Sequence, residues 1–237
     1  MATVYVGTSG FAYPTWKPGF YPANVPAARF LDHYASRLNS VEVNYTFRSL
    51  ASEKTQDSWI AKTPDSFLFC PKAHMRITHV LKLRKAEEAT AAFVNSLGPW
   101  RQANKLGPVL FQLPPNMQCD METLVAFLNI LPKSQRFTFE FRHPSWFNAD
   151  VYAALAKSNA ALCLAESEKL ETPETSTADF VYYRLRKPDY TDEDVKAIAV
   201  TVKSIVGRDQ DVFVFFKHED TPDGALNAEK LLKYCTE

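Results

Sequence analysis

The sequence predicts a single-domain α/β protein over residues 1–237, a TIM-type (β/α)8 barrel with a degenerate sixth helix. Three observations support this prediction. Short apolar segments alternate with helical patterns along the chain, which is typical of βαβ units and a parallel sheet. Eight such segments are present, and the 237 residues suit a fold that usually needs about 250. The segments also begin apolar and repeatedly end polar, as expected where a barrel carries its ligand site.

The predicted strands are runs of apolar, β-branched and aromatic side chains. They cover residues 3–7, 40–44, 67–70, 108–112, 137–141, 160–165, 180–185 and 212–216. The main structural alternative is an open doubly wound sheet, which usually offers a glycine-rich phosphate turn after its first strand. The segment in that place, GTSGFAYPTW at residues 7–16, lacks the G-x-G-x-x-G spacing. The barrel is therefore favoured.

Helical patterns separate these strands. They cover residues 27–38, 52–61, 82–100, 120–131, 149–157, 191–206 and 227–234. Ser52 and Asp120 are positioned to cap two of the helices, and Thr191 with Asp194 resembles a capping box. Residues 166–178 are polar, contain a proline and lack an apolar stripe. We therefore expect mostly loop where a sixth helix would lie.

Composition and charge narrow the class of protein. Lys plus Arg is 27 and Asp plus Glu is 27, so the formal net charge is zero, which disfavours sequence-blind binding of nucleic acid. No signal-peptide pattern and no apolar run of about 20 residues is present, so we expect no membrane span. The four cysteines form no C-x-x-C pair, and a cytoplasmic location is expected.

Polar side chains gather where the predicted strands end. In a barrel these ends form one rim, and ligands bind there. Alternation places Glu140 and Arg142 on one strand face, with the phenylalanines at 137, 139 and 141 on the opposite face, toward the helices. Because a buried charge is costly unless it is paired, the polar set indicates either a ligand site or a structural ion-pair network.

Roles can be assigned to this set by side-chain chemistry. Arg142, Arg184 and Lys72 are candidates for binding an anion, because arginine grips oxyanions with paired hydrogen bonds. Glu42 or Glu140 is the candidate general base or acid, with a pKa tuned by burial. The remaining ligand-binding candidates from the strand ends are Asn44, Gln112 and Lys217.

Histidines and tryptophans supply further candidates. His74 and His143 are reserve catalytic residues, although His143 equally fits a role in ordering its loop. Trp16 and Trp146 are candidates for stacking on a base or sugar, against the alternative that they pack as loop core. The histidines that follow strands, at 74, 79, 143 and 218, show no H-x-H or H-E-x-x-H spacing. We therefore expect no bound metal and no cofactor, and we expect the mid-helix His33 to be structural.

Longer motifs resemble the YecE-like family, a domain of unknown function. They are GTSGFAYPTW at residues 7–16, FYP at 20–22, LDHYASRLNSVEVNYTFRSL at 31–50, FLFCPKAHMRITH at 67–79, LGPVLFQLPP at 106–115 and FEFRHPSWF at 139–147. The resemblance implies a TIM barrel and supplies no established activity. Many members follow the seventh strand with R-x-H-G and end the eighth with F-N-N. Here the residues are RLRK at 184–187 and FKH at 216–218, so roles of those His-Gly and Asn-Asn pairs do not carry over.

Three functions remain open at this point. The first is an enzyme acting on a small anionic ligand, phosphorylated or carboxylated, for which a hydrolase, a lyase and an isomerase fit equally. The second is a nucleic-acid processing protein that cuts phosphodiesters, which the zero net charge and the scarcity of Asp at the strand ends disfavour. The third is a non-catalytic ligand-binding barrel.

Overall fold

The strands of the protein lie close to their predicted positions. The computed structural model describes residues 2–166, 170, 172–217 and 220–237. Within these residues the strands are β1 Val4–Thr8, β2 Ser40–Val43, β3 Leu68–Pro71, β4 Val109–Gln112, β5 Phe137–Glu140, β6 Ala160–Ala165, β7 Phe180–Leu185 and β8 Asp211–Phe216. All eight predicted strands are thus present, and each end lies within one residue of its predicted position.

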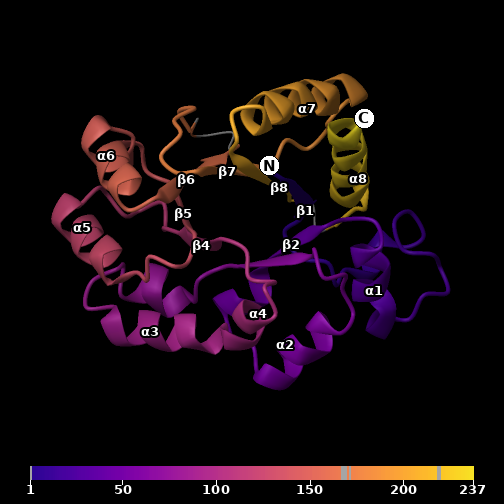
Figure 1. The fold of residues 1–237 in the computed structure, drawn as a ribbon, viewed down its shortest axis with the longest axis horizontal. Helices are drawn as coiled ribbons and strands as arrows, with labels where there is room; N and C mark the ends of the chain where they lie inside the picture. Colours follow the sequence, from indigo (N-terminus) through magenta and orange to yellow (C-terminus); the bar gives the residue numbers. More distant parts are fainter. Residues whose placement is uncertain (1, 167–169, 171, 218–219) are drawn as a thin grey trace.

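The strands form two parallel sheets. Six of them make a half-barrel in the order β1-β8-β7-β6-β5-β4, and β2 pairs with β3. Isolated parallel bridges join the facing edges, from Ser9 to Glu42 and from Lys72 to Leu110. Figure 1 shows the helices outside the strands. Because neighbouring strands run in the same direction, their carboxyl ends and the polar residues there lie at the same side of the molecule.

The helices follow the predicted alternation. They are α1 Phe30–Ala35, α2 Glu53–Ile60, α3 Glu87–Ser96, α4 Gly98–Gln102, α5 Met121–Ile130, α6 Ala149–Lys157, α7 Asp192–Val206 and α8 Asp223–Thr236. Ser52 and Asp120 accept hydrogen bonds from the backbone three residues on, and Thr191 with Asp194 forms a full capping box. The predicted caps are therefore confirmed. No helix of the described residues is both long and apolar enough to cross a bilayer.

Three helix predictions were wrong in extent, and one of them is the helix expected over residues 227–234, which spans Asp223–Thr236 as α8. The expected helix over residues 82–100 is two helices, because Lys82, Leu83 and Lys85 have positive φ angles and a proline opens α4. The expected helix over residues 27–38 begins as a 3-10 turn, Ala27–Arg29, before α1. The predicted lack of a complete sixth helix holds for the described residues between β6 and β7, which contain no helix. Residues 167–169 and 171 of that prediction lie outside the described part.

Apolar packing separates an outer layer from an interior. In β5, Phe139 lies on the outer face, where its ring stacks on Phe111 at 5.2 Å and meets Phe127 of α5. The interior is filled by another cluster, which includes Tyr182 and Phe215. Thr138 and Glu140 of β5 are buried on the interior side, so the predicted alternation of β5 is confirmed.

β1 meets β2 through side chains. Asn39 receives the Val6 N–H at 2.7 Å and donates its amide to the Val4 carbonyl at 2.8 Å. The buried Tyr34 hydroxyl accepts the Thr8 N–H at 2.8 Å. Gly7 makes this approach possible, because a Cβ there would lie 1.9 Å from the Ser40 carbonyl oxygen. Asn39 therefore replaces the strand-to-strand hydrogen bonds that this edge of β1 lacks.

Removing the Asn39 amide tests this joint. We expect Asn39→Ala to lower the free energy of unfolding by about 2–4 kcal/mol, since it leaves two partly buried backbone groups without partners. Urea denaturation measures the change. The matched control is Asn129→Ala on the exposed face of α5, which should change stability by less than about 0.5 kcal/mol. Equal losses in the two variants would contradict the joint.

Candidate functional site

A buried ion-pair network occupies the carboxyl ends of the strands, and Arg184 lies at its centre. Arg184 comes from the end of β7 and is 1% exposed. Its Nη2 donates to Glu42 Oε1 of β2 at 2.7 Å, and its Nη1 donates to Glu140 Oε2 of β5. One guanidinium thus ties together three strands from both sheets. This fork-shaped donor suits two carboxylates better than a lysine would.

Glu42 is enclosed by donors. Ser9 donates its hydroxyl to Oε1 at 2.7 Å, and Tyr182 donates to Oε2 at 2.8 Å. Burial alone would raise the pKa of Glu42, but the Arg184 guanidinium and the hydrogen bonds outweigh it and lower that pKa. Glu42 is therefore ionised in the fold, and its side chain is completely buried.

Glu140 gathers more cations. Its Oε2 also accepts the Gln112 amide at 2.8 Å, while its Oε1 accepts Nε of Arg142 and Nη2 of Arg186, each at 2.9 Å. Burial opposes ionisation, yet the charges of Arg184, Arg186 and Arg142 hold the pKa of Glu140 well below its ordinary value of 4.5. A carboxylate whose pKa falls on folding stabilises the protein above its unfolded pKa. That stability is lost as the pH falls toward the folded value.

Lys72 extends the network from β3. Its Nζ donates to Gln112 Oε1 at 2.9 Å and lies 4.1 Å from the centre of the Phe47 ring. Burial, and then the positive charge of Arg184, lower the pKa of Lys72 to about 8. The Gln112 side chain therefore connects Lys72 with Glu140, because its oxygen accepts from Lys72 and its nitrogen donates to Glu140.

His79 borders the same cluster. Its ring meets the Phe47 ring edge-on at 5.1 Å. Burial, and then the positive charges of Lys72 and Arg142, lower the pKa of His79. We noted its position after the third strand but did not choose it as a site residue. The segment Arg76–Val80, a short π-helix, turns it back toward Lys72, and the sequence gives no signal for such a turn.

The geometry bears on several predicted roles. Glu42 and Glu140 were expected to act as base or acid; both are almost fully enclosed and ionised, and a general base must reach its substrate. Arg184 was expected to bind the anion; both of its terminal nitrogens donate to these carboxylates. These contacts favour the structural ion-pair network, which was the alternative interpretation for the three residues.

The tryptophans Trp16 and Trp146 are buried in the loops that contain them. Trp16 and Trp146 are both 0% exposed, so no ligand reaches their faces in this structure. Trp146 stacks on Phe141 at 4.6 Å and donates to the Met117 carbonyl at 2.7 Å. Trp16 packs against Tyr21 and other rings of its loop. Packing as loop core, the alternative weighed for both tryptophans, is what their burial and contacts support.

The predicted histidines contact their own loops. His74 Nε2 lies 3.2 Å from the Arg48 carbonyl, joining the loops after β2 and β3. His143 accepts the Ser145 N–H at 3.2 Å and caps a short 3-10 turn. Among the described residues, no contact links either ring to Glu140 or Glu42. Loop ordering, the alternative weighed for His143, is what its contacts support.

Two further predicted residues, Asn44 and Lys217, directly follow their strands. Asn44 begins a 3-10 turn after β2 and is half-buried. Lys217 is half-buried directly after β8, with its N–H bonded to the Leu185 carbonyl at 2.9 Å. His218, noted among the histidines, lies outside the described residues.

Arg186 is the main site residue that was not chosen. It shares a strand face with Tyr182 and Arg184, and this alternation was visible in the sequence. Its backbone N–H donates to Glu166 at 2.7 Å, which fixes the turn after β7. Ser9 was also missed, because it looks like an ordinary loop hydroxyl in the sequence. No group of three or more His, Cys, Asp or Glu side chains within the described residues is arranged to hold a metal ion.

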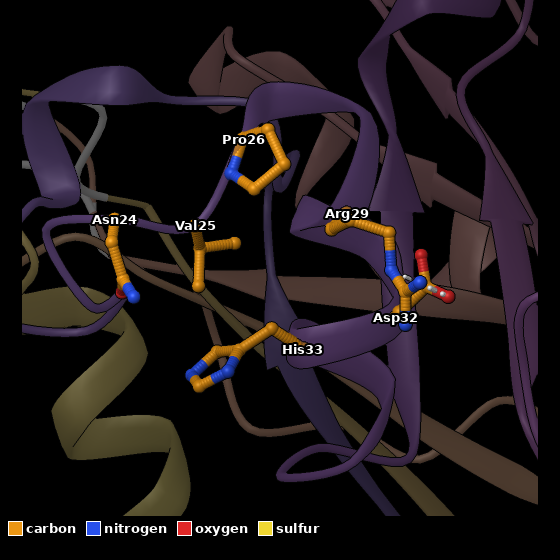
Figure 2. Close-up of a pocket in the computed structure, with 6 residues that line it drawn as sticks. All are labelled: Asn24, Val25, Pro26, Arg29, Asp32 and His33. Carbon is orange, nitrogen blue, oxygen red and sulfur yellow. Dashed lines mark ion pairs between the residues drawn. The ribbon is translucent and has the colours of Figure 1, made fainter.

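A separate surface pocket lies beside α1. It has a volume of about 420 Å³ and is lined by Asn24, Val25, Pro26, Arg29, Asp32 and His33. Figure 2 shows the Arg29–Asp32 ion pair, 3.4 Å long, at one end and the His33 ring at the other. His33 Nε2 lies 3.0 Å from the Phe20 carbonyl, in line with the structural role expected for it. Among the described residues, none of this lining contacts the ion-pair network.

The fold and the network define a parallel α/β protein with a charged site at the carboxyl ends of its strands. The chain belongs to the DUF72 family, proteins of unknown function, whose family model matches residues 5–237. It is 30% identical over 156 residues to the UPF0759 protein YunF of Bacillus subtilis (strain 168), covering 63% of this chain and 54% of that one. It is 29% identical over 146 residues to the UPF0759 protein YecE of Escherichia coli (strain K12), covering 61% and 50%.

The chain therefore spans about half the length of these curated relatives. A crystal structure of a DUF72 family protein from Thermotoga maritima MSB8 superposes with a TM-score of 0.82 at 26% identity, covering 99% of this chain and 100% of that one. The resemblance to the YecE-like family is thus confirmed, and these relatives name no activity.

Truncating Arg184 tests its central position. We expect Arg184→Ala to lower the free energy of unfolding by about 3–5 kcal/mol, because it leaves two carboxylates buried without their main partner. Arg142→Ala is the control, since Arg142 is a third exposed and Glu140 retains Arg184 and Arg186; a loss below about 1 kcal/mol is expected. Chemical denaturation compares them. Similar losses of unfolding free energy in the two variants would show that the network does not depend mainly on Arg184.

The pKa of Lys72 can be tested by pH-dependent acetylation with acetic anhydride, followed by peptide mass spectrometry. Only the neutral amine reacts, so half-maximal reactivity should fall near pH 8 instead of the ordinary 10.5. The groups facing Lys72 are the Gln112 amide, the Phe47 ring, the His79 ring and four charged residues, Glu42, Glu140, Arg142 and Arg184. Arg142→Ala removes a positive charge and should raise the midpoint. A wild-type midpoint near 10.5 would refute the shift.

Proposed function

We propose that this protein binds a small anionic ligand, phosphorylated or carboxylated, at the carboxyl ends of its strands and acts on it as an enzyme. One observation carries the proposal. Arg142 and Arg186 both donate to the same oxygen of Glu140, at 2.9 Å each, and their side chains remain 34% and 18% exposed. They are therefore anchored at one edge while still open to solvent. Such guanidiniums are well suited to gripping an oxyanion.

We further propose that the two sheets close into one (β/α)8 barrel, which would make this site the barrel mouth. The bridges Ser9–Glu42 and Lys72–Leu110 support closure at both edges between the sheets. At one edge the Gly10 N–H donates to the Glu42 carbonyl at 2.8 Å, and at the other the Ala73 N–H donates to the Leu110 carbonyl at 2.8 Å. In barrels of this kind the ligand site lies at the carboxyl ends of the strands.

Proton transfer in this proposal falls to Lys72 and His79, because the carboxylates are enclosed. Lys72 has a pKa of about 8, so it exchanges a proton near neutral pH, and the pKa of His79 is also lowered. The positive charge of Arg142 contributes to the lowered pKa of both. The arrangement fits a hydrolase, a lyase or an isomerase equally. No cofactor and no metal enter the proposal, and the four unpaired cysteines fit a cytoplasmic setting.

Removing the Arg142 guanidinium tests the binding step. We expect Arg142→Ala to weaken binding of inorganic phosphate or glycerol 3-phosphate about tenfold or more, because charge-assisted hydrogen bonds are lost. Calorimetric titration measures the affinity, and a melting curve checks the fold. Arg208→Ala, which removes an exposed guanidinium after α7, is the matched control and should leave the affinity unchanged. If Arg142→Ala keeps wild-type affinity, the site assignment is wrong.

A further inference from the structure

The hydrogen-bonded network at the carboxyl ends of the strands carries more positive than negative charge. Its contacts connect four cations, Lys72, Arg142, Arg184 and Arg186, with two carboxylates, Glu42 and Glu140. The difference is two positive charges. Glu42, Glu140 and Arg184 are buried, whereas Arg142 and Arg186 remain 34% and 18% exposed, so the excess charge can be reached from solvent.

Both terminal nitrogens of Arg184 donate to the two carboxylates. The remaining cations of the network are Lys72, Arg142 and Arg186, of which the two arginines share one oxygen of Glu140. In the described part of the chain, both Nη groups of Arg142 and the Nη1 and Nε groups of Arg186 have no hydrogen-bond partner. The Nζ of Lys72 donates only to Gln112 there. Three side chains of the network thus keep donors that no protein group of the described residues accepts, although the Nε of Arg186 is itself buried.

We infer that the ligand is a phosphomonoester or inorganic phosphate in its dianionic form. A carboxylate or a phosphodiester brings one negative charge, whereas a phosphomonoester brings about 1.5–2 at pH 7 and offers three acceptor oxygens. Two charges match the excess, and three acceptor oxygens match the three side chains that keep donors without a protein partner among the described residues, Lys72, Arg142 and Arg186. The inference rests on the proposed function and names the ligand class of that same site.

The surroundings favour a dianion over a polynucleotide. Lys72 is connected to Glu140 through the Gln112 side chain. Lys72, Arg142 and Arg186 are therefore grouped around Glu140 and Gln112, and they do not form an extended row of cations. Phosphodiester backbones are usually tracked by cations spread along a surface. The neutral rings of Phe47 and His79 close the Lys72 side of this cluster. One compact terminal phosphate is the occupant that these contacts suit.

The test compares small anions that differ in charge. Calorimetric titration of the whole chain at about pH 7.5 uses methyl phosphate, dimethyl phosphate and acetate, where methyl phosphate is the dianion because its second pKa is about 6. We expect methyl phosphate to bind at least about tenfold more tightly than either monoanion. Lowering the pH to about 5 should weaken methyl phosphate, while sulfate, which stays doubly charged, should not weaken.

Variants that remove one positive charge test which residues cause the preference for the dianion. Arg186→Gln should reduce the ratio between methyl phosphate and dimethyl phosphate to about threefold or less, and Arg142→Gln provides a second variant should Arg186→Gln fail to fold. Arg208→Gln should leave the ratio unchanged. Equal binding of all the anions, an unchanged ratio in the folded variants, or tighter binding of a single-stranded oligonucleotide would overturn the dianion inference. Each of those results leaves anion binding itself intact. Absence of binding by every anion would overturn the proposed function as well.

Discussion

The bridge from Arg184 to two buried carboxylates is the interaction on which the rest of the site depends. Glu42 belongs to the two-stranded sheet and Glu140 to the six-stranded one, so the guanidinium holds both sheets at their carboxyl ends. Such a bridge is a weak source of net stability, since desolvation offsets much of the Coulomb attraction. Its value is positional, because two planar hydrogen-bonding groups and a fixed fork allow few alternative arrangements. A loose lysine would define these strand ends far less sharply.

The positions of Arg142, Arg186 and Lys72 depend on this bridge. Glu140 directs one oxygen toward Arg184 and Gln112 and leaves the other for Arg142 and Arg186. The same carboxylate therefore orients the guanidiniums that face solvent. Lys72 is oriented by the far end of Gln112, which receives its own orientation from Glu140. A change at Glu140 would consequently reach every proposed ligand contact, although Glu140 itself is hidden from the ligand.

Sequence reasoning located the strand ends, whereas the burial of the residues at those ends could not be predicted from it. Alternation and capping chemistry are local, so β5 could be phased from Phe137, Phe139 and Glu140, and the start of α7 from Thr191 and Asp194. The solvent exposure of a side chain, in contrast, depends on residues that are distant in the sequence. Whether Glu42 is a base or a structural partner depends on Tyr182 and Arg184, about 140 residues further along the chain. The same holds for Trp16 and Trp146, whose aromatic surface suits a ligand or a loop core equally until the neighbouring rings are placed.

Position 186 shows how one departure from the family pattern changes this site. The resemblance places a histidine at this position in many members, whereas this chain has Arg186. A histidine carries its charge only at lower pH, but an arginine is always charged. Here the added guanidinium donates to Glu140 at 2.9 Å, so it strengthens the hold on that carboxylate and adds one permanent charge to the side that faces solvent. For the proposed anion, Arg186 therefore keeps its charge over a pH range in which a histidine at this position would lose it. The pH dependence of the proposed binding then comes from the ligand and from Lys72 and His79, and not from position 186.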